Sequence, residues 1–182
     1  MTLTLLWSGK ITDDTGMLAL VDPVAYQGFI DRDWTYEQIV ERFREAMTLR
    51  QLLIWETGFE GIWRVRISDD DDRSREAAQG FRSITGPIQT SGTLYLVNYE
   101  TLSMVAQFED ERIDSPGKLR FCLTVKPDIY NVTIVQMFNP DAQTDDPPAV
   151  DPPAVDFNIY LQSASQTEAV ADPWNGIAWC RQ

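Results

Sequence analysis

Most of this chain alternates between apolar and polar residues, and that alternation restricts the fold more than any other feature. In the stretch 62–68, Trp63, Val65 and Ile67 fall on one side of an extended chain, and Arg64, Arg66 and Ser68 fall on the other. This period of two residues is typical of a β-strand with one buried face. The same pattern predicts about nine strands, at 2–7, 16–21, 49–56, 62–68, 92–98, 102–108, 118–125, 129–138 and 157–162. We expect those at 49–56 and 62–68 to form a hairpin through the turn TGFEG.

One segment, RDWTYEQIVERFREAM, has a helical pattern instead. Thr35 is followed three residues later by Gln38, which is the spacing of a capping box at a helix start. The apolar residues after it share one face of a helix: Ile39, Val40, Phe43, Ala46 and Met47. The sequence therefore predicts a mainly β fold, an antiparallel β-sandwich with one amphipathic helix at residues 35–47 packed against it. At 182 residues we expect a single domain over residues 1–182.

The segment DPPAVDPPAV, residues 146–155, repeats five residues twice. Paired prolines favour an extended polyproline II conformation and exclude a central strand. We therefore expect a surface loop or spacer at this point in the domain.

The chain is strongly acidic, with 28 Asp and Glu against 15 Lys and Arg and a net charge of −13. Such a charge repels nucleic acid and anionic membranes and attracts a basic partner, although it also simply keeps a protein soluble. Two runs concentrate the charge and are the candidate contacts for a basic protein partner: Asp69, Asp70, Asp71 and Asp72, and Glu109, Asp110 and Glu111.

The sequence contains no histidine, which removes Ser-His-Asp and Cys-His catalysis and the common zinc sites. The run Asp69–Asp72 lacks the spaced ligands, the glycine and the closing glutamate of an EF-hand. We therefore expect no catalytic residue, no metal and no cofactor. Cys122 and Cys180 are compatible with one disulfide or with two free thiols.

The N-terminal stretch MTLTLLWSGK has no basic region, and its apolar run is too short for a signal peptide. No later run approaches the length of a membrane span. The expected location is the cytoplasm, and we expect no membrane association.

A second function, from another class, is suggested by WETGFEGIW. Trp55, Glu56 and Glu60 have the composition of a sugar site, in which an aromatic ring stacks on the sugar and two carboxylates act on the glycosidic bond. The alternative function is thus a glycan-binding module or hydrolase that uses the loop from Trp55 to Trp63.

The helix start D-W-T-x-E-x-I, from Asp33 to Ile39, and the later segment Asp128–Ile134, which ends in Y-x-V-T-I, resemble the competence protein J family. The resemblance covers roughly residues 16–138. Members of that family are small acidic bacterial proteins that inhibit a secreted or surface nuclease involved in DNA uptake. The resemblance implies a non-enzymatic inhibitor or immunity-type protein that acts on a basic enzyme such as a nuclease, without binding nucleic acid directly.

Overall fold

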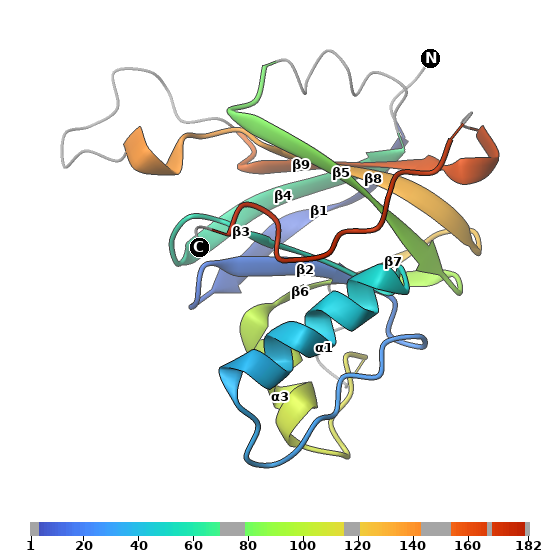
Figure 1. Cartoon of the computed structure of the whole chain (residues 1–182). Coiled ribbons are helices and arrows are strands. Elements are labelled where there is room, and N and C mark those ends of the chain that lie inside the picture. The colour runs from blue at the N-terminus through green and yellow to red at the C-terminus, as the bar shows by residue number, and fades with distance from the viewer. Residues whose placement is uncertain (1–3, 70–78, 115–120, 143–153, 167–168, 181–182) are drawn as a thin grey trace.

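The computed structural model describes residues 4–69, 79–114, 121–142, 154–166 and 169–180, and two β-sheets packed together form its body (Figure 1). The mainly β sandwich predicted from the sequence is confirmed. The five-stranded sheet has the order β1 (Thr4–Asp13), β4 (Gly61–Asp69), β9 (Phe157–Ser163), β8 (Asp128–Gln136) and β5 (Arg82–Thr90). The four-stranded sheet has the order β3 (Leu52–Glu56), β2 (Met17–Val21), β6 (Thr93–Asn98) and β7 (Cys122–Thr124). All of these pairs are antiparallel except β4 with β9.

The strands differ in how they bury their residues, and the inner strands β8 and β9 of the five-stranded sheet carry continuous buried runs, from Tyr130 to Gln136 and from Phe157 to Leu161. In β4 the buried residues alternate, and Trp63, Val65 and Ile67 are buried as predicted. Strands β2, β3 and β6 instead carry runs of four consecutive buried residues. One face of their sheet contacts the five-stranded sheet, and the helices cover the other face (Figure 1). The molecule is therefore built in three layers, of sheet, sheet and helix.

Helix α1 (Tyr36–Thr48) confirms the predicted helix and its capping box. The backbone N–H of Gln38 donates to the Thr35 hydroxyl at 3.4 Å, and the backbone N–H of Thr35 donates to Gln38 Oε1 at 2.7 Å. Ile39, Phe43, Ala46 and Met47 form the buried face. The capping residues therefore define where the helix begins, and the apolar face places it on the sheet.

A second helix, α3 (Tyr99–Gln107), occupies most of the stretch 102–108 that the sequence analysis predicted as a strand. That prediction is wrong, because Leu102, Val105 and Ala106 are buried at a helical spacing of three and four residues. The Asn98 side chain caps this helix by accepting a hydrogen bond from the Thr101 backbone N–H at 3.1 Å. Two short 3₁₀ helices, Pro140–Ala142 and Ala164–Gln166, also lie within the described ranges. None of these helices is long and apolar enough to cross a membrane.

The predicted hairpin between residues 49–56 and 62–68 is also wrong. Strand β3 pairs with β2, whereas β4 pairs with β1 and β9, so the turn between them carries the chain from one sheet to the other. The edge strand β5 was not predicted, since Gly86 and Pro87 interrupt its pattern. A proline is tolerated there because an edge strand leaves one side of its backbone unpaired.

The C-terminal segment, defined here as residues 169–180, runs across the side of the sandwich (Figure 1). The indole of Trp174 is buried and donates a hydrogen bond to the carbonyl of Thr85 at 2.9 Å. Ala178 pairs in parallel with Trp55 of the edge strand β3. The segment therefore covers part of the edge of β3 with hydrogen bonds from a distant part of the sequence.

Candidate functional site

The two acidic runs proposed from the sequence lie on different layers of the molecule. Asp69 is exposed at the end of β4, in the five-stranded sheet, whereas Glu109, Asp110 and Glu111 follow α3 on the far side of the four-stranded sheet. Asp70, Asp71 and Asp72 lie outside the described residues. The runs therefore do not combine into one surface through the residues that the structure describes.

The loop after α3 has a well-defined backbone. The N–H of Phe108 donates to the carbonyl of Met104 at 3.0 Å, and the N–H of Glu111 donates to the carbonyl of Phe108 at 3.1 Å. The guanidinium of Arg112 donates to the carbonyls of Glu109 and Glu111 at 2.5 and 2.8 Å. These bonds leave the side chains of Glu109 and Asp110 exposed and that of Glu111 half-buried. The loop thus presents carboxylates on a fixed backbone.

A second acidic segment, which the sequence analysis missed, lies against this loop. The N–H groups of Ile30 and Asp31 both donate to the carbonyl of Ala106, at 2.9 and 3.3 Å. The Gln107 side-chain amide donates to the carbonyl of Arg32 at 3.3 Å, across 75 residues of sequence. These hydrogen bonds bring Asp31 and the neighbouring Asp33 close to the loop after α3. Both side chains are exposed.

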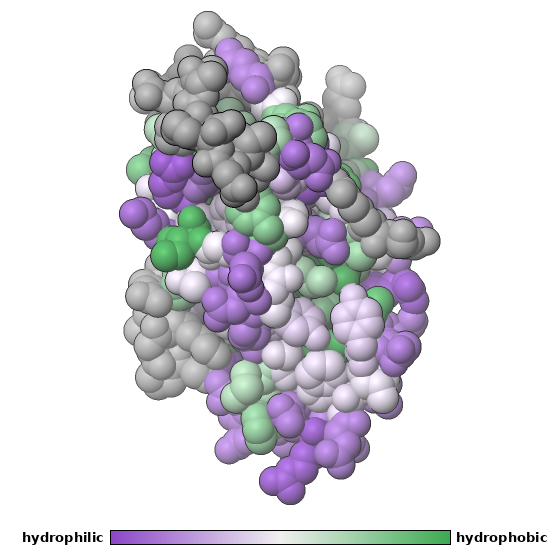
Figure 2. Space-filling view, turned by 90° about the vertical axis from the view of Figure 1, so that its left-hand side faces the viewer, coloured by the Kyte–Doolittle hydropathy of each residue, from purple (hydrophilic) through white to green (hydrophobic). Residues whose placement is uncertain are grey.

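We call the resulting surface the acidic patch, and its members are Asp31, Asp33, Glu109, Asp110 and Glu111. The segments that form it meet at the lower end of the molecule in Figure 1. Figure 2 shows hydrophilic residues gathered at that end, with hydrophobic residues among them. Five carboxylates share these segments with two arginines, Arg32 and Arg112, so the patch carries net negative charge. A surface of this kind attracts positively charged groups on a partner.

The alternative sugar site does not have the geometry that the sequence suggested. Trp55 is fully buried in β3, where its ring packs 6.3 Å from that of Phe157, measured between centroids. Trp55 is therefore a core residue and cannot stack on a sugar, which corrects that part of the alternative site. Glu56 is half-buried and Glu60 is exposed, at the two ends of the turn between β3 and β4.

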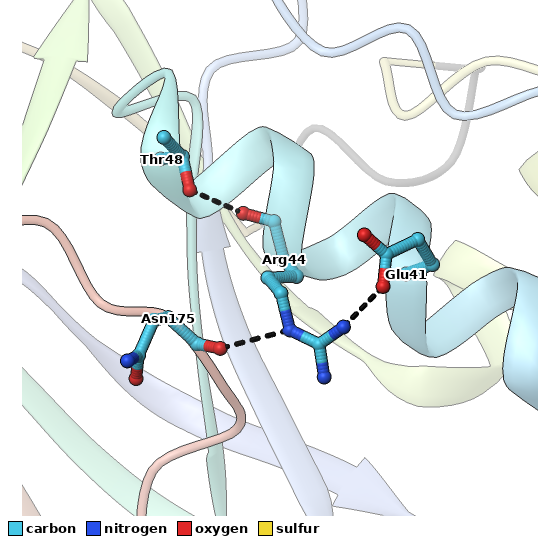
Figure 3. Close-up of polar contacts among 4 residues, drawn as sticks. All are labelled: Glu41, Arg44, Thr48 and Asn175. Carbon is cyan, nitrogen blue, oxygen red and sulfur yellow. Dashed lines mark hydrogen bonds and ion pairs between the residues drawn. The ribbon is translucent and has the colours of Figure 1, made fainter.

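A hollow of about 380 Å³ lies beside α1, and its lining residues are Glu41, Arg44, Glu45, Thr48 and Leu49. The Arg44 guanidinium pairs with Glu41 and donates through Nε to the carbonyl of Asn175 at 3.0 Å (Figure 3). Glu45 lies 3.6 Å from the guanidinium of Arg42. Because both carboxylates are paired with arginines, the hollow does not resemble the facing carboxylates of a glycosidase. Its arginine instead links α1 to the C-terminal segment.

Neither of the two cysteines is part of a disulfide; Cys122 is half-buried and Cys180 is exposed. Burial, together with the nearby Glu56 carboxylate, raises the pKa of the Cys180 thiol above its ordinary value. A raised pKa disfavours the thiolate, which is the nucleophilic form. Within the described ranges, no group of three or more Cys, Asp or Glu side chains is arranged to hold a metal ion.

No family model and no curated protein matches the chain. Two solved structures share its fold. The crocagin biosynthetic gene J protein matches with a TM-score of 0.58 at 15% identity, over 90% of this chain and 99% of that one. ComJ from Bacillus subtilis, an inhibitor of the DNA degrading activity of NucA, matches with a TM-score of 0.50 at 9% identity, over 90% of this chain and 100% of that one. The resemblance to competence protein J is thus confirmed for the fold, and it extends beyond residues 16–138.

Proposed function

We propose that this chain is a non-enzymatic binding protein that inhibits a basic enzyme, most concretely a nuclease. The observation that carries the proposal is the shared fold with ComJ, which extends over the whole of that inhibitor. A fold alone supports many functions, so the proposal also needs a surface suited to the task.

Charge supplies the second support. A nuclease holds phosphates in its substrate groove, and groups that attract phosphates also attract carboxylates. The chain has a net charge of −13, and its acidic patch displays carboxylates on a fixed backbone. Such a surface can occupy a basic groove in place of DNA and gain association rate from electrostatic steering. The run that begins at Asp69 is a second candidate contact in the same proposal.

The sequence also supports a non-enzymatic role. The chain lacks histidine, the commonest general base at neutral pH. The pKa of the Cys180 thiol is raised, which is the opposite of what a nucleophilic cysteine requires. Binding, without bond cleavage, is the function that these residues support best.

An assay of DNA degradation tests the proposal. Extracts of the source cells are incubated with linear DNA and increasing amounts of the purified chain, at salt concentrations from about 0.05 to 0.5 M. We expect nuclease activity to fall as the chain is added, with weaker inhibition at high salt because screening reduces electrostatic attraction. Undiminished DNA degradation at saturating amounts of the chain, or degradation of DNA by the purified chain itself, would overturn the proposal.

A further inference from the structure

Three large apolar side chains are exposed beside the acidic patch. Phe29 is 41% exposed, Met104 is 44% exposed and Phe108 is 37% exposed. Each of them exposes apolar surface to water, which is unfavourable in free energy for the isolated protein. We call these three residues the apolar centre.

The apolar centre belongs to one junction between a loop and a helix. Gly28 lies directly against α3, because a Cβ atom at that position would come within 2.6 Å of Val105 Cγ1. Two residues later, the backbone N–H of Ile30 donates to the carbonyl of Ala106 in the same helix. Both residues next to Phe29 in the sequence therefore contact α3. Met104 and Phe108 lie one helical turn apart, as the hydrogen bond between their backbones shows.

The other exposed large apolar residues are distributed differently. They lie singly on β1, β4, the two ends of α1 and the loops or segments near β2, β5 and β9: Leu5, Val24, Tyr36, Leu49, Ile62, Phe81 and Val170. Single exposed apolar residues are normal on soluble proteins, whereas a group with a polar border marks an interaction surface. Phenylalanine and methionine are also enriched at the centre of protein interfaces.

We infer that the apolar centre, bordered by the acidic patch, is the surface that docks on the enzyme. This inference rests on the proposed function and specifies its partner: the enzyme presents an apolar hollow bordered by lysine and arginine side chains. The carboxylates accelerate encounter with the basic border, and the apolar side chains slow dissociation by filling the hollow. Because backbone hydrogen bonds fix both segments before binding, little ordering entropy is lost on docking.

Two variants with the same change in net charge test the position of the surface. Met104→Arg places a positive charge in the apolar centre. Leu49→Arg places one at the C-terminal end of α1, and the helix is about 20 Å long, with its other end next to Asp33 of the acidic patch. Inhibition of DNA degradation in the source extract is the readout. We expect Met104→Arg to raise the half-inhibitory concentration by about tenfold or more, since it opposes a basic partner and removes an apolar contact. We expect Leu49→Arg to remain within about twofold of the unmodified chain.

The outcomes separate this inference from the proposed function. If the unmodified chain inhibits and both variants inhibit equally well, the docking surface is wrong and the proposed function stands. An equal loss in both variants also rejects the surface, because overall charge and not position then decides. If the unmodified chain does not inhibit, the proposed function fails and the inference fails with it.

A second pair of variants removes only apolar surface. Phe29→Ser shortens the apolar centre, and Ile62→Ser makes a similar change on β4, where Ile62 is 64% exposed. Thermal unfolding of each variant shows whether it retains the fold. We expect inhibition to be several-fold weaker for Phe29→Ser and unchanged for Ile62→Ser. Unchanged inhibition by a folded Phe29→Ser variant would contradict the inference.

Discussion

Two groups of carboxylates in this molecule have the same chemistry but opposite surroundings. Asp13, the last residue of β1, is fully buried. Its Oδ1 accepts the backbone N–H groups of Gly16 and Met17 at 2.9 and 3.0 Å, and its Oδ2 accepts hydrogen bonds from the Thr57 hydroxyl and the Trp63 indole, both at 3.1 Å. In the acidic patch, by contrast, Asp31, Asp33, Glu109 and Asp110 are exposed and Glu111 is half-buried.

Asp22, after β2, resembles Asp13. Its Oδ1 accepts the N–H groups of Val24 and Ala25 at 2.8 and 2.9 Å, and its Oδ2 accepts the N–H and hydroxyl of Ser91 at 2.5 and 2.9 Å. Buried carboxylates with this many donors hold turns and connect the two sheets, and they are not available to a partner. The comparison shows that net charge overstates the binding capacity of an acidic protein, because some of its carboxylates are buried and hydrogen-bonded within the fold.

The largest effect that would test this comparison is expected at Asp13. Asp13→Ala leaves several buried donors without an acceptor, and we expect the free energy of unfolding to fall by about 3 to 5 kcal/mol. The matched control is Asp14→Ala, which changes the same charge at an exposed neighbouring position and should alter stability by less than about 0.5 kcal/mol. Denaturant unfolding measures both values. Equal losses in the two variants would contradict the division into fixed and available carboxylates.

An intermediate effect is expected at Asp22, and it depends on pH. Burial raises the pKa of Asp22, but the hydrogen bonds from Ser91, Ala25 and Val24 outweigh burial, and the net shift is below the ordinary value of 3.8. Because the pKa is lower in the folded state, the stability that Asp22 contributes is fully present above the unfolded value. It is lost as the pH falls through the folded value.

Asp22→Asn should therefore lower the free energy of unfolding by about 1 to 3 kcal/mol at neutral pH. The variant should also lose less stability than the unmodified chain when the pH is lowered below about 4. Unfolding curves recorded from about pH 7 to pH 2.5 measure both quantities. Parallel pH profiles for the two proteins would show that Asp22 is not a fixed carboxylate of the kind described.

The smallest effect on stability is expected in the acidic patch. Glu109→Gln combined with Asp110→Asn should change the free energy of unfolding by less than about 0.5 kcal/mol, because both side chains are exposed. The same change should weaken inhibition at low salt and reduce its dependence on salt, since the patch contributes mainly to association. A loss of stability above about 1 kcal/mol would assign these residues to the fold instead.

Local signals in the sequence predicted the parts of the fold that depend on neighbouring residues. The capping box at Thr35 and Gln38 specified where α1 begins, because both partners lie within one turn. Helix α3 was missed although Asn98 is a strong N-cap residue and Leu102, Val105 and Ala106 have helical spacing. A segment of this length contains too few apolar residues to separate the two periods clearly.

The features that depend on long-range pairing could not be read from the sequence. The hairpin prediction failed because strand alternation shows which face is buried but not which strand is the neighbour. The acidic patch was only half predicted for the same reason. Glu109 to Glu111 form a visible run, whereas Asp31 and Asp33 join them only through the contacts of Ile30 and Asp31 with Ala106.

The pairing of Ala178 with Trp55 has a consequence for the order of events during synthesis. The edge of β3 leaves the ribosome long before its covering segment does, and at about 5 to 20 residues per second the delay is on the order of ten seconds. During that interval the nascent chain exposes unpaired backbone groups that can pair with another molecule. Newly made chains are thus open to misassembly at this edge until Ala178 has left the ribosome.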